Sequence, residues 1–455
     1  MIGLRSKLHI YGALRGYRAG PAARFHMPGH KGRRLPCARA PFDITELPFS
    51  GCLEDASGVI GRAQEDVAQL LGAAFAEILT DGSTAGVYGM IYAAGRAGAR
   101  KVILPRNAHK SAYNACAVLG IEPVALANPA QGGAFLPPTA AQFAAALDAE
   151  GEGCAVLVTS PDYFGVCADL PALRKLCDEK GALLLADGAH GAFMRFDTAA
   201  AGKYAGRFAD LWVDGSHKTM PTLTQGALLC GRDRRLHGHV REALDRFRTT
   251  SPSYPIMASV EYGVKFMAER GAALCARVRA DLAKAREILL NAGIACLPSD
   301  TLVLAPDLGT AGLYPHEMAA ALRAQGIWAE LETDRHIVFY NSPLTPRGAL
   351  ARLAKRMAKL EERLPRSAAL PAGPAACTER AASYLEALHA PCEWVPFAEA
   401  VGRVCARSAG VTPPCYPVAL AGERIGEEAA RALEGAAHTF GTEGGKIAVL
   451  RTEQA

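Results

Sequence analysis

The sequence predicts an α/β protein with a large domain built on a mainly parallel sheet, a smaller α+β domain and a C-terminal cap. Short apolar and β-branched runs recur between about residues 100 and 231, and segments of helix length such as LPALRKLCDEKG separate them. Strands that alternate with helices form βαβ units, hence a parallel sheet covered on both faces. The predicted strands are KVIL (101–104), AVLVTS (155–160), ALLLAD (182–187), LWVD (211–214) and GALLCG (226–231).

The pattern changes after the SPSYPIMASVEYG segment. A long helical pattern reaches about Asn291, and short strands are expected near TLVLAP and HIVFYNS. The Pro- and Ala-rich stretch LPRSAALPAGPAA has the composition of a linker. We therefore predict an N-terminal segment (1–45), a large domain (46–255), a small α+β domain (256–364) and a C-terminal domain (377–455).

The composition excludes several classes of protein. The 50 basic residues nearly balance the 45 acidic ones, and no basic run of the kind that binds nucleic acid occurs. The 13 cysteines are scattered, so neither a CxxC metal pair nor a redox pair exists. The N-terminus lacks the apolar core of a signal peptide, and no run of ~18 apolar residues occurs. A cytoplasmic enzyme without a metal is the expectation.

Ligands bind at the carboxyl ends of the strands in sheets of this kind. Polar residues follow the predicted strands at these ends, namely Arg106 to His109, Asp162, Asp187 to His190, and Ser216 to Lys218.

The segment TDGSTAG places Ser83 and Thr84 just before a helical run. Backbone N–H groups and two hydroxyls at a helix N-terminus can hold a phosphate. Ser and Thr are also ordinary N-cap residues, so capping alone is the competing interpretation.

Asp187 ends the apolar strand ALLLAD and is followed by GAHGAF, which includes His190. A carboxylate there can pair with a protonated pyridine nitrogen and keep a cofactor ring acting as an electron sink. The competing interpretation is again a helix N-cap.

Lys218 lies in SHKTMPTLTQG, between two predicted strands and beside Ser216 and His217. A desolvated lysine with a lowered pKa can form a Schiff base with a carbonyl cofactor. Most lysines are instead solvated surface charges. The position between two strands favours the functional interpretation.

Phosphate-binding residues, a strand-end Asp and a strand-end Lys, in this order, resemble the large domain of fold-type I (aspartate-aminotransferase-like) enzymes, which use pyridoxal 5'-phosphate. The finer resemblance is to compact members of the ornithine/lysine/arginine decarboxylase family, and it runs through nearly the whole chain. It is carried by FHMPGHKG, FDITELPF, DGSTAG, PRNAHKSAYNA, ADGAHGA, SHKTMPTLTQ and TTSPSYPIMAS, and weakly by TPPCYPVALAGE.

The resemblance implies a role for each matching residue. Lys218 would carry the cofactor as a Schiff base, Asp187 would face the ring nitrogen, and His109 would stack on the ring. The phosphate would meet Ser83 and Thr84, with Ser216 and His217 close by, and His190 would flank the ring edge. The segment containing Thr250 would reach the phosphate of a neighbouring subunit, in a homodimer or a dimer of dimers.

The chain departs from the family in three places. Relatives commonly have Ser three residues before the lysine, where this chain has Gly215. The C-terminal motif usually reads like YPPGIPLLVPGE, of which TPPCYPVALAGE keeps only the outline. Large bacterial members also carry an N-terminal receiver-like wing, and the first motif here starts too early to leave room for one.

The resemblance implies decarboxylation of arginine, lysine or ornithine to the corresponding amine and CO2, with Lys218 or His217 returning a proton to Cα. A buried cation needs a carboxylate partner, and Asp43 and Glu46 in FDITELPFSGCLED are the candidates, although acidic loop residues are usually solvated. Aminotransfer or β-elimination stays open, with Arg335 as a possible clamp for a second carboxylate. A catalytically silent relative with a regulatory role is a further alternative.

Other motifs are rejected. GSTAG lacks the central Ser of a nucleophile elbow, and FGTEGGKI lacks the first Gly of a P-loop and the hydroxyl residue after Lys. His26 and His30 are four positions apart, but Pro28 and Gly29 between them break the helix that would align them as metal ligands.

Overall fold

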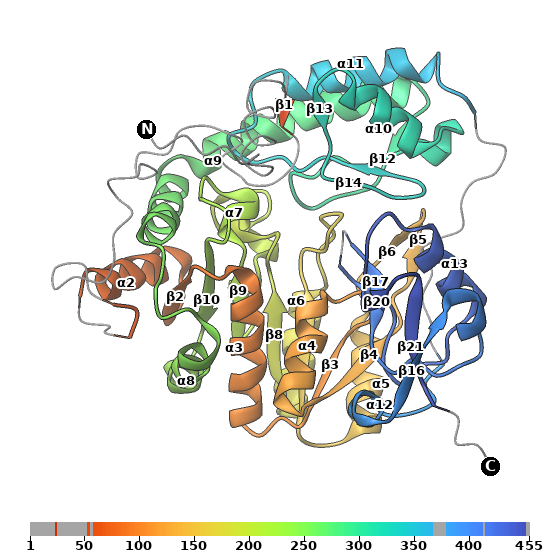
Figure 1. Ribbon diagram of the computed structural model, residues 1–455. Coiled ribbons are helices and arrows are strands. Elements are labelled where there is room, and N and C mark those ends of the chain that lie inside the picture. The colour runs from red at the N-terminus through yellow and green to blue at the C-terminus, as the bar shows by residue number, and fades with distance from the viewer. Residues whose placement is uncertain (1–22, 25–51, 55–57, 367–378, 413–414, 452–455) are drawn as a thin grey trace, which may run out of the picture.

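A seven-stranded sheet forms the centre of the computed structural model, which describes residues 23–24, 52–54, 58–366, 379–412 and 415–451. The strand order is β2-β10-β9-β8-β7-β3-β4 (Figure 1). Only β10 runs antiparallel to its neighbours, so the predicted mainly parallel sheet is confirmed. The strands are β2 (Phe75–Leu79), β3 (Lys101–Pro105), β4 (Glu122–Leu126), β7 (Cys154–Thr159), β8 (Leu183–Asp187), β9 (Leu211–Asp214) and β10 (Ala227–Gly231).

Two of these strands, β2 and β4, were not predicted from the sequence. β2 reads FAEIL, with a charge at its centre, and β4 reads EPVAL, with a proline that cannot donate to a ladder. The tertiary structure explains why the strands tolerate this charge and this proline. The Glu77 side chain is 3% exposed and its Oε1 lies 2.7 Å from His237 Nε2, while β4 pairs on one side only, as the edge strand.

Helices cover both faces of the sheet, because successive side chains of each strand point to opposite faces. In β3, Val102 and Leu104 pack in the core under α3, α4 and α8, while Ile103 packs in the core under α2, α5 and α6. These helices are α2 (Val59–Leu71), α3 (Gly82–Arg96), α4 (Lys110–Leu119), α5 (Ala140–Glu150), α6 (Leu170–Lys180) and α8 (His237–Phe247).

The long helix α9 (Tyr254–Asn291) ends where the sequence pattern predicted, and it packs against α11 (Ala349–Glu361). Short strands complete this smaller part, and β1 pairs with β13 in parallel. The elements are β1 (Ala23–Arg24), β11 (Ala295–Cys296), β12 (Pro306–Asp307), α10 (Pro315–Arg323), β13 (Ile327–Trp328), β14 (Leu331–Glu332) and β15 (Ile337–Val338).

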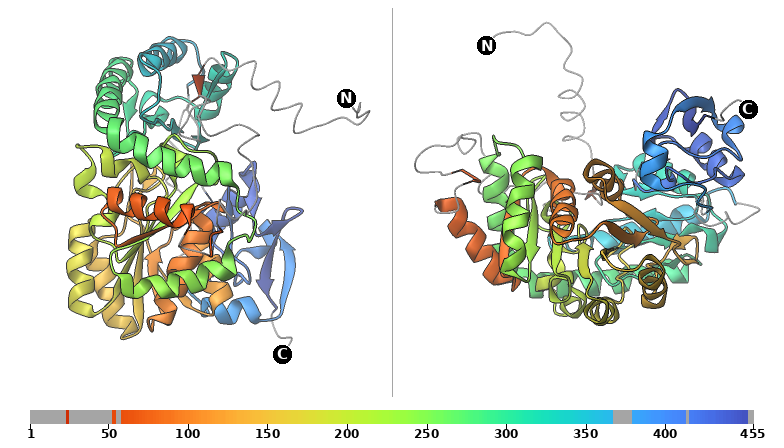
Figure 2. Two further views of the ribbon diagram at one scale, coloured as in Figure 1. Left: turned by 90° about the vertical axis from the view of Figure 1, so that its left-hand side faces the viewer. Right: turned by 90° about the horizontal axis from the view of Figure 1, so that it is seen from below.

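The C-terminal elements have their own hydrophobic cluster and lie at the β4 end of the sheet, away from β2 (Figures 1 and 2). The elements are α12 (Tyr384–His389), β16 (Cys392–Pro396), β17 (Ala409–Val411), β18 (Pro417–Ala419), α13 (Glu427–Gly435), β19 (Thr439–Phe440), β20 (Thr442–Glu443) and β21 (Lys446–Leu450). The hairpin β5 (Ala130–Gln131) and β6 (Ala134–Phe135) reaches toward them, since Phe135 stacks edge-on against Tyr416. The domain boundaries predicted above remain a proposal.

A buried ion pair joins the C-terminal part to the sheet. Arg106, which follows β3, donates from Nη2 to Glu423 Oε2 at 2.7 Å and to the Val418 carbonyl at 2.8 Å. Both side chains are less than a tenth exposed. Arg106 belongs to the segment that leads to His109, so this pair connects the C-terminal part to the predicted site.

Replacing Glu423 with alanine should lower the free energy of unfolding by roughly 3–5 kcal/mol, because it leaves the Arg106 guanidinium buried without its carboxylate. The measurement is denaturant unfolding of the purified protein. Glu379→Ala is the matched control, since its pair with Arg424 is exposed and such pairs contribute about 0–1 kcal/mol. Equal losses in both variants would contradict the role given to the buried pair.

No helix among the described residues is long and apolar enough to cross a membrane.

Candidate active site

The predicted site residues on the sheet meet at one edge (Figure 1). Asp187 is the last residue of β8 at this edge. The other residues lie where β2 is followed by α3, β3 by α4, and β9 by α7 (Ser216–Thr219). The structure brings together Lys218, Asp187, His109 and His190, since each affects the charge state of another. Parallel strands end at the same edge, which explains why residues up to 109 positions apart converge.

Lys218 is desolvated and lies next to a histidine. Its Nζ is 2.9 Å from His190 Nε2. Burial lowers the pKa of Lys218 from its usual 10.5, and the nearby carboxylates of Asp187 and Glu330 partly oppose this shift. A lowered pKa leaves more of the amine unprotonated and nucleophilic at neutral pH. Lys218 is therefore not the solvated surface lysine of the competing interpretation.

Asp187 is the last residue of β8 and is only 6% exposed. Its Oδ1 accepts the N–H of Ala189 at 3.1 Å. The next helical segment, the 3-10 turn Ala192–Phe196, has Gly191 and not Asp187 as its N-cap. The helix-cap interpretation of Asp187 is therefore wrong, and its carboxylate stands at the sheet edge beside Lys218 and His109.

The three histidines of the site are held in the neutral form. Burial lowers the pKa of His109 and of His217 to about 4, and that of His190 well below its usual range. His109 caps α4 and its Nδ1 accepts the Ser111 N–H at 3.2 Å, which fixes the ring orientation. His217 Nδ1 lies 3.0 Å from the Gly226 carbonyl oxygen, so Nδ1 carries the proton and donates it to this acceptor.

The start of α3 provides a cradle for an anion. The N-cap of α3 is Asp81, so Ser83 and Thr84 lie in the first turn and the plain N-cap interpretation is wrong. Ser83 Oγ and Ser216 Oγ are both buried and have no hydrogen-bond partner among the described residues. Buried hydroxyls are usually satisfied by protein, water, an ion or a ligand, so these two are free to accept such a partner. These residues, next to helix N–H groups, fit the phosphate of pyridoxal phosphate.

Gly215 is required by close packing in this cradle. A Cβ at this position would lie 2.4 Å from the Ala189 carbonyl oxygen and 3.0 Å from Ser83 Oγ. A serine would therefore not fit here without a shift of the backbone. The next residue, Ser216, is fully buried.

Sequence reasoning missed an aromatic and acidic cluster beside His190. The rings of Tyr163 and Tyr340 approach the His190 ring edge-on, with centroids at 5.1 and 5.5 Å. Tyr163 donates its hydroxyl to Glu330 Oε1 at 2.9 Å, and Tyr340 donates to the Tyr163 carbonyl at 2.7 Å. Tyr163 lies in the loop after β7, next to the strand-end residue Asp162, and could have been found from this position. Glu330 comes from the smaller part of the chain, and no local signal marks it.

The remaining predicted residues lie elsewhere. Thr250 is exposed in the connection between α8 and α9, and the preceding residue, Thr249, donates its N–H to Asp81 Oδ2 at 3.4 Å. Asp43 and Glu46 lie outside the described residues, as do His26 and His30. Within the described part of the chain, no group of three or more His, Cys, Asp or Glu side chains is arranged to hold a metal ion.

Arg335 was considered as a carboxylate clamp for aminotransfer. Its Nε and Nη2 donate to the two carboxylate oxygens of Asp307 at 2.7 and 2.8 Å. This bidentate pair uses the planar face that would bind a substrate carboxylate. Arg335 therefore does not act as a free clamp.

Residues 9–297 match the family model described as "Orn/Lys/Arg decarboxylase, major domain". The chain belongs to this family. It is 29% identical to the uncharacterized protein YaaO of Bacillus subtilis, with 93% of each chain covered. It is 28% identical to an arginine decarboxylase of Halalkalibacterium halodurans, covering 89% of this chain and 88% of that one. The motif-based prediction of the family is confirmed.

A similar fold is seen in a solved structure, that of the constitutive lysine decarboxylase of E. coli. It superposes with a TM-score of 0.71 at 19% identity, covering 89% of this chain and 74% of that one. This likeness concerns the fold, and together with the observed sheet it confirms the predicted fold-type I architecture.

Proposed function

We propose that this member of the Orn/Lys/Arg decarboxylase family uses pyridoxal phosphate to decarboxylate a cationic amino acid, arginine, lysine or ornithine, to the amine and CO2. The observation that carries the proposal is the meeting of a desolvated lysine, a buried carboxylate and two unpartnered hydroxyls at one sheet edge. The named relatives that act on arginine or lysine support the cationic substrate.

The cofactor, when bound, supplies an electron sink for the pair released as carbon dioxide leaves. Lys218 would bind it covalently through Nζ, and the Asp187 carboxylate would hold a proton on the ring nitrogen. His109 would lie against the ring face, and His190 would lie at the ring edge, where it hydrogen-bonds the Lys218 amine. The phosphate would be held by Ser83, Thr84 and Ser216, with His217 and Thr250 nearby.

The proton returned to Cα comes from Lys218 Nζ in our proposal, rather than from His217. Burial lowers the pKa of His217 to about 4, so the imidazole is rarely protonated at neutral pH. Burial lowers the pKa of the Lys218 amine, while the carboxylates of Asp187 and Glu330 oppose this shift and favour its protonated form. Lowering a lysine pKa toward the operating pH makes the amine a better proton donor and acceptor.

We propose that Glu330 meets the distal charge of the substrate. It is near Lys218, and its carboxylate is oriented by the Tyr163 hydroxyl. Asp43 and Glu46 remain candidates for the same task. Aminotransfer is disfavoured, because the proposed clamp, Arg335, is paired with Asp307.

The proposed function is tested by incubating the purified protein and pyridoxal phosphate with arginine, lysine and ornithine in turn. Mass spectrometry should find agmatine, cadaverine or putrescine, with an equal amount of CO2. Formation of a keto acid would instead indicate an aminotransferase. A preference for neutral or acidic amino acids would overturn the substrate class, and a protein that does not bind the cofactor would be a silent relative.

Glu330→Gln should raise KM for the cationic substrate about 10- to 100-fold, because a charge-assisted hydrogen bond of about 1.5–3 kcal/mol is lost. Steady-state kinetics with the preferred substrate measures this. Glu332→Gln is the matched control, two residues away and paired with Arg323. Asp43→Asn and Glu46→Gln are compared in the same assay, and the variant with the largest rise in KM identifies the carboxylate that binds the distal charge. An unchanged KM in Glu330→Gln would exclude Glu330.

We further propose a cytoplasmic homodimer, or a dimer of dimers, with shared active sites. The exposed position of Thr250 beside the start of α3 suits a residue that reaches across a subunit interface. Light scattering during size-exclusion chromatography tests the assembly, and a monomer with full activity would refute shared sites.

A further inference from the structure

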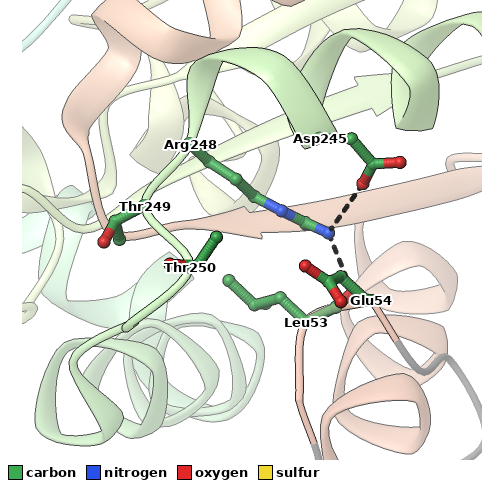
Figure 3. A pocket seen from close by; sticks show the side chains of 6 residues that line it. All are labelled: Leu53, Glu54, Asp245, Arg248, Thr249 and Thr250. Atoms are coloured by element: carbon green, nitrogen blue, oxygen red, sulfur yellow. Dashed lines mark hydrogen bonds and ion pairs between the residues drawn. The ribbon is translucent and has the colours of Figure 1, made fainter.

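Arg248 is a buried cation that the proposed mechanism does not use. It follows α8 as its C-cap, and its side chain is 4% exposed. Its Nη2 donates to the Leu53 carbonyl at 3.0 Å and lies 3.7 Å from Asp245 Oδ1. Its Nη1 lies 3.6 Å from Glu77 Oε2. Figure 3 shows the guanidinium reaching from the end of α8 toward Asp245 and the Leu53–Glu54 segment.

The pocket beside Arg248 is too small for a ligand. Its volume is about 10 Å³, the lower limit for one water molecule. The carboxylates of Glu54, Glu77 and Asp245 surround the guanidinium and disfavour an anion. The contacts of Arg248 are therefore with other parts of the protein and not with a ligand. The pocket is lined by Leu53, Glu54, Asp245, Arg248, Thr249 and Thr250.

The contacts of Arg248 lead to the start of α3. Glu77 lies on β2, and β2 runs directly into Asp81, the N-cap of α3. On the other side, Thr249 follows Arg248 and donates its N–H to Asp81 Oδ2 at 3.4 Å. The guanidinium thus joins the end of α8 to the strand that leads into the anion cradle, and the next residue, Thr249, contacts the N-cap that precedes the cradle.

We propose that Arg248 is a positioning residue for the phosphate end of the cofactor site. It fixes the Thr249–Thr250 turn against Asp81, the N-cap that immediately precedes the first turn of α3 with Ser83 and Thr84. This inference rests on the proposed function. A phosphate gains affinity only from donors that are already fixed, because ordering a loose segment on binding costs entropy. The proposed ring contacts come from β8, the start of α4 and α7, and not from this turn.

Arg248→Met should therefore raise the Kd for pyridoxal phosphate about tenfold, equivalent to one interaction of about 1.4 kcal/mol. The Kd for pyridoxal, which lacks the phosphate, should not change. Both are measured by fluorescence titration of cofactor-free protein. In the same protein, hydrogen exchange of the Thr249 amide should become faster, since its contact with Asp81 is loosened. Glu77 keeps His237 as its partner at 2.7 Å, which favours folding of the variant.

Arg246→Met is the matched control, an exposed arginine two residues earlier on α8, and it should change none of these quantities. Asp81→Ala removes the acceptor of the Thr249 amide without touching the buried cluster, so exchange of this amide should become faster. The Kd of this variant is not a test, because the substitution also removes a carboxylate beside the cradle. Unaltered exchange in Asp81→Ala, or an unchanged Kd in folded Arg248→Met, would overturn the proposal, as would equal losses for both ligands. Failure of the wild-type protein to bind pyridoxal phosphate would refute the proposed function instead, while unaltered Thr249 exchange in Arg248→Met would refute the positioning role.

Discussion

Replacing Lys218 with alanine should abolish covalent binding of pyridoxal phosphate and lower turnover by at least about 10³-fold, the typical scale for losing a positioned acid–base group. Lys218 is the desolvated amine at the sheet edge, and burial lowers its pKa below the usual 10.5. The visible absorbance of the bound cofactor should disappear. Borohydride reduction of the wild-type protein, followed by peptide mass analysis, should place the cofactor on the peptide that contains Lys218.

The same pKa shift predicts a pH dependence. Only the unprotonated amine attacks the cofactor carbonyl, so the rate of covalent binding should rise with pH through the pKa of Lys218 and level off above it. Because burial lowers that pKa, the midpoint should fall below 10.5. Lys203→Ala serves as the control, since Lys203 is exposed and paired with Asp300. A cofactor still reducible onto the Lys218→Ala chain would show that another lysine carries it.

Asp187→Asn should leave the cofactor bound but slow turnover on the order of a hundredfold or more, the usual cost of losing one preorganised electrostatic contact at the reacting group. The neutral amide cannot stabilise a proton on the pyridine nitrogen, so the ring becomes a poorer electron sink. Asp187 is 6% exposed, and water therefore does not replace the lost charge. Single-turnover kinetics separates this loss from any change in substrate binding.

Asp169→Asn provides the contrast for Asp187. Asp169 is a true helix cap, whose side chain accepts the Ala172 N–H at the start of α6. Asparagine caps helices as well as aspartate does, so turnover in this variant should match the wild type. Nearly full activity in Asp187→Asn would contradict the proposed catalytic role and would leave Asp187 only its structural hydrogen bond to Ala189.

The strand-end residues were predictable because the topology of a parallel sheet brings them together. Once KVIL, ALLLAD and LWVD are recognised as parallel strands, their carboxyl ends must lie along one edge, and His109, Asp187 and Lys218 follow them. Glu77 in β2 and Pro123 in β4 obscured the two strands that the sequence did not reveal. A charge such as that of Glu77 can be buried only if it has a partner, here His237. This partner lies far away in the sequence, so no local pattern reveals it.

Local periodicity and motifs encode strands, helices and their ends, so the fold class and the family could be predicted from the sequence alone. The same motifs supplied the residues that we propose for the anion cradle and the cofactor edge. The tertiary structure alone decided which distant side chains meet in the site and around it. The Tyr163–Glu330 contact spans 167 positions, the Arg106–Glu423 pair spans 317, and Arg248 meets Leu53 across 195. Such contacts depend on how separate parts of the chain pack, and burial then sets the pKa of Lys218 and of the three histidines.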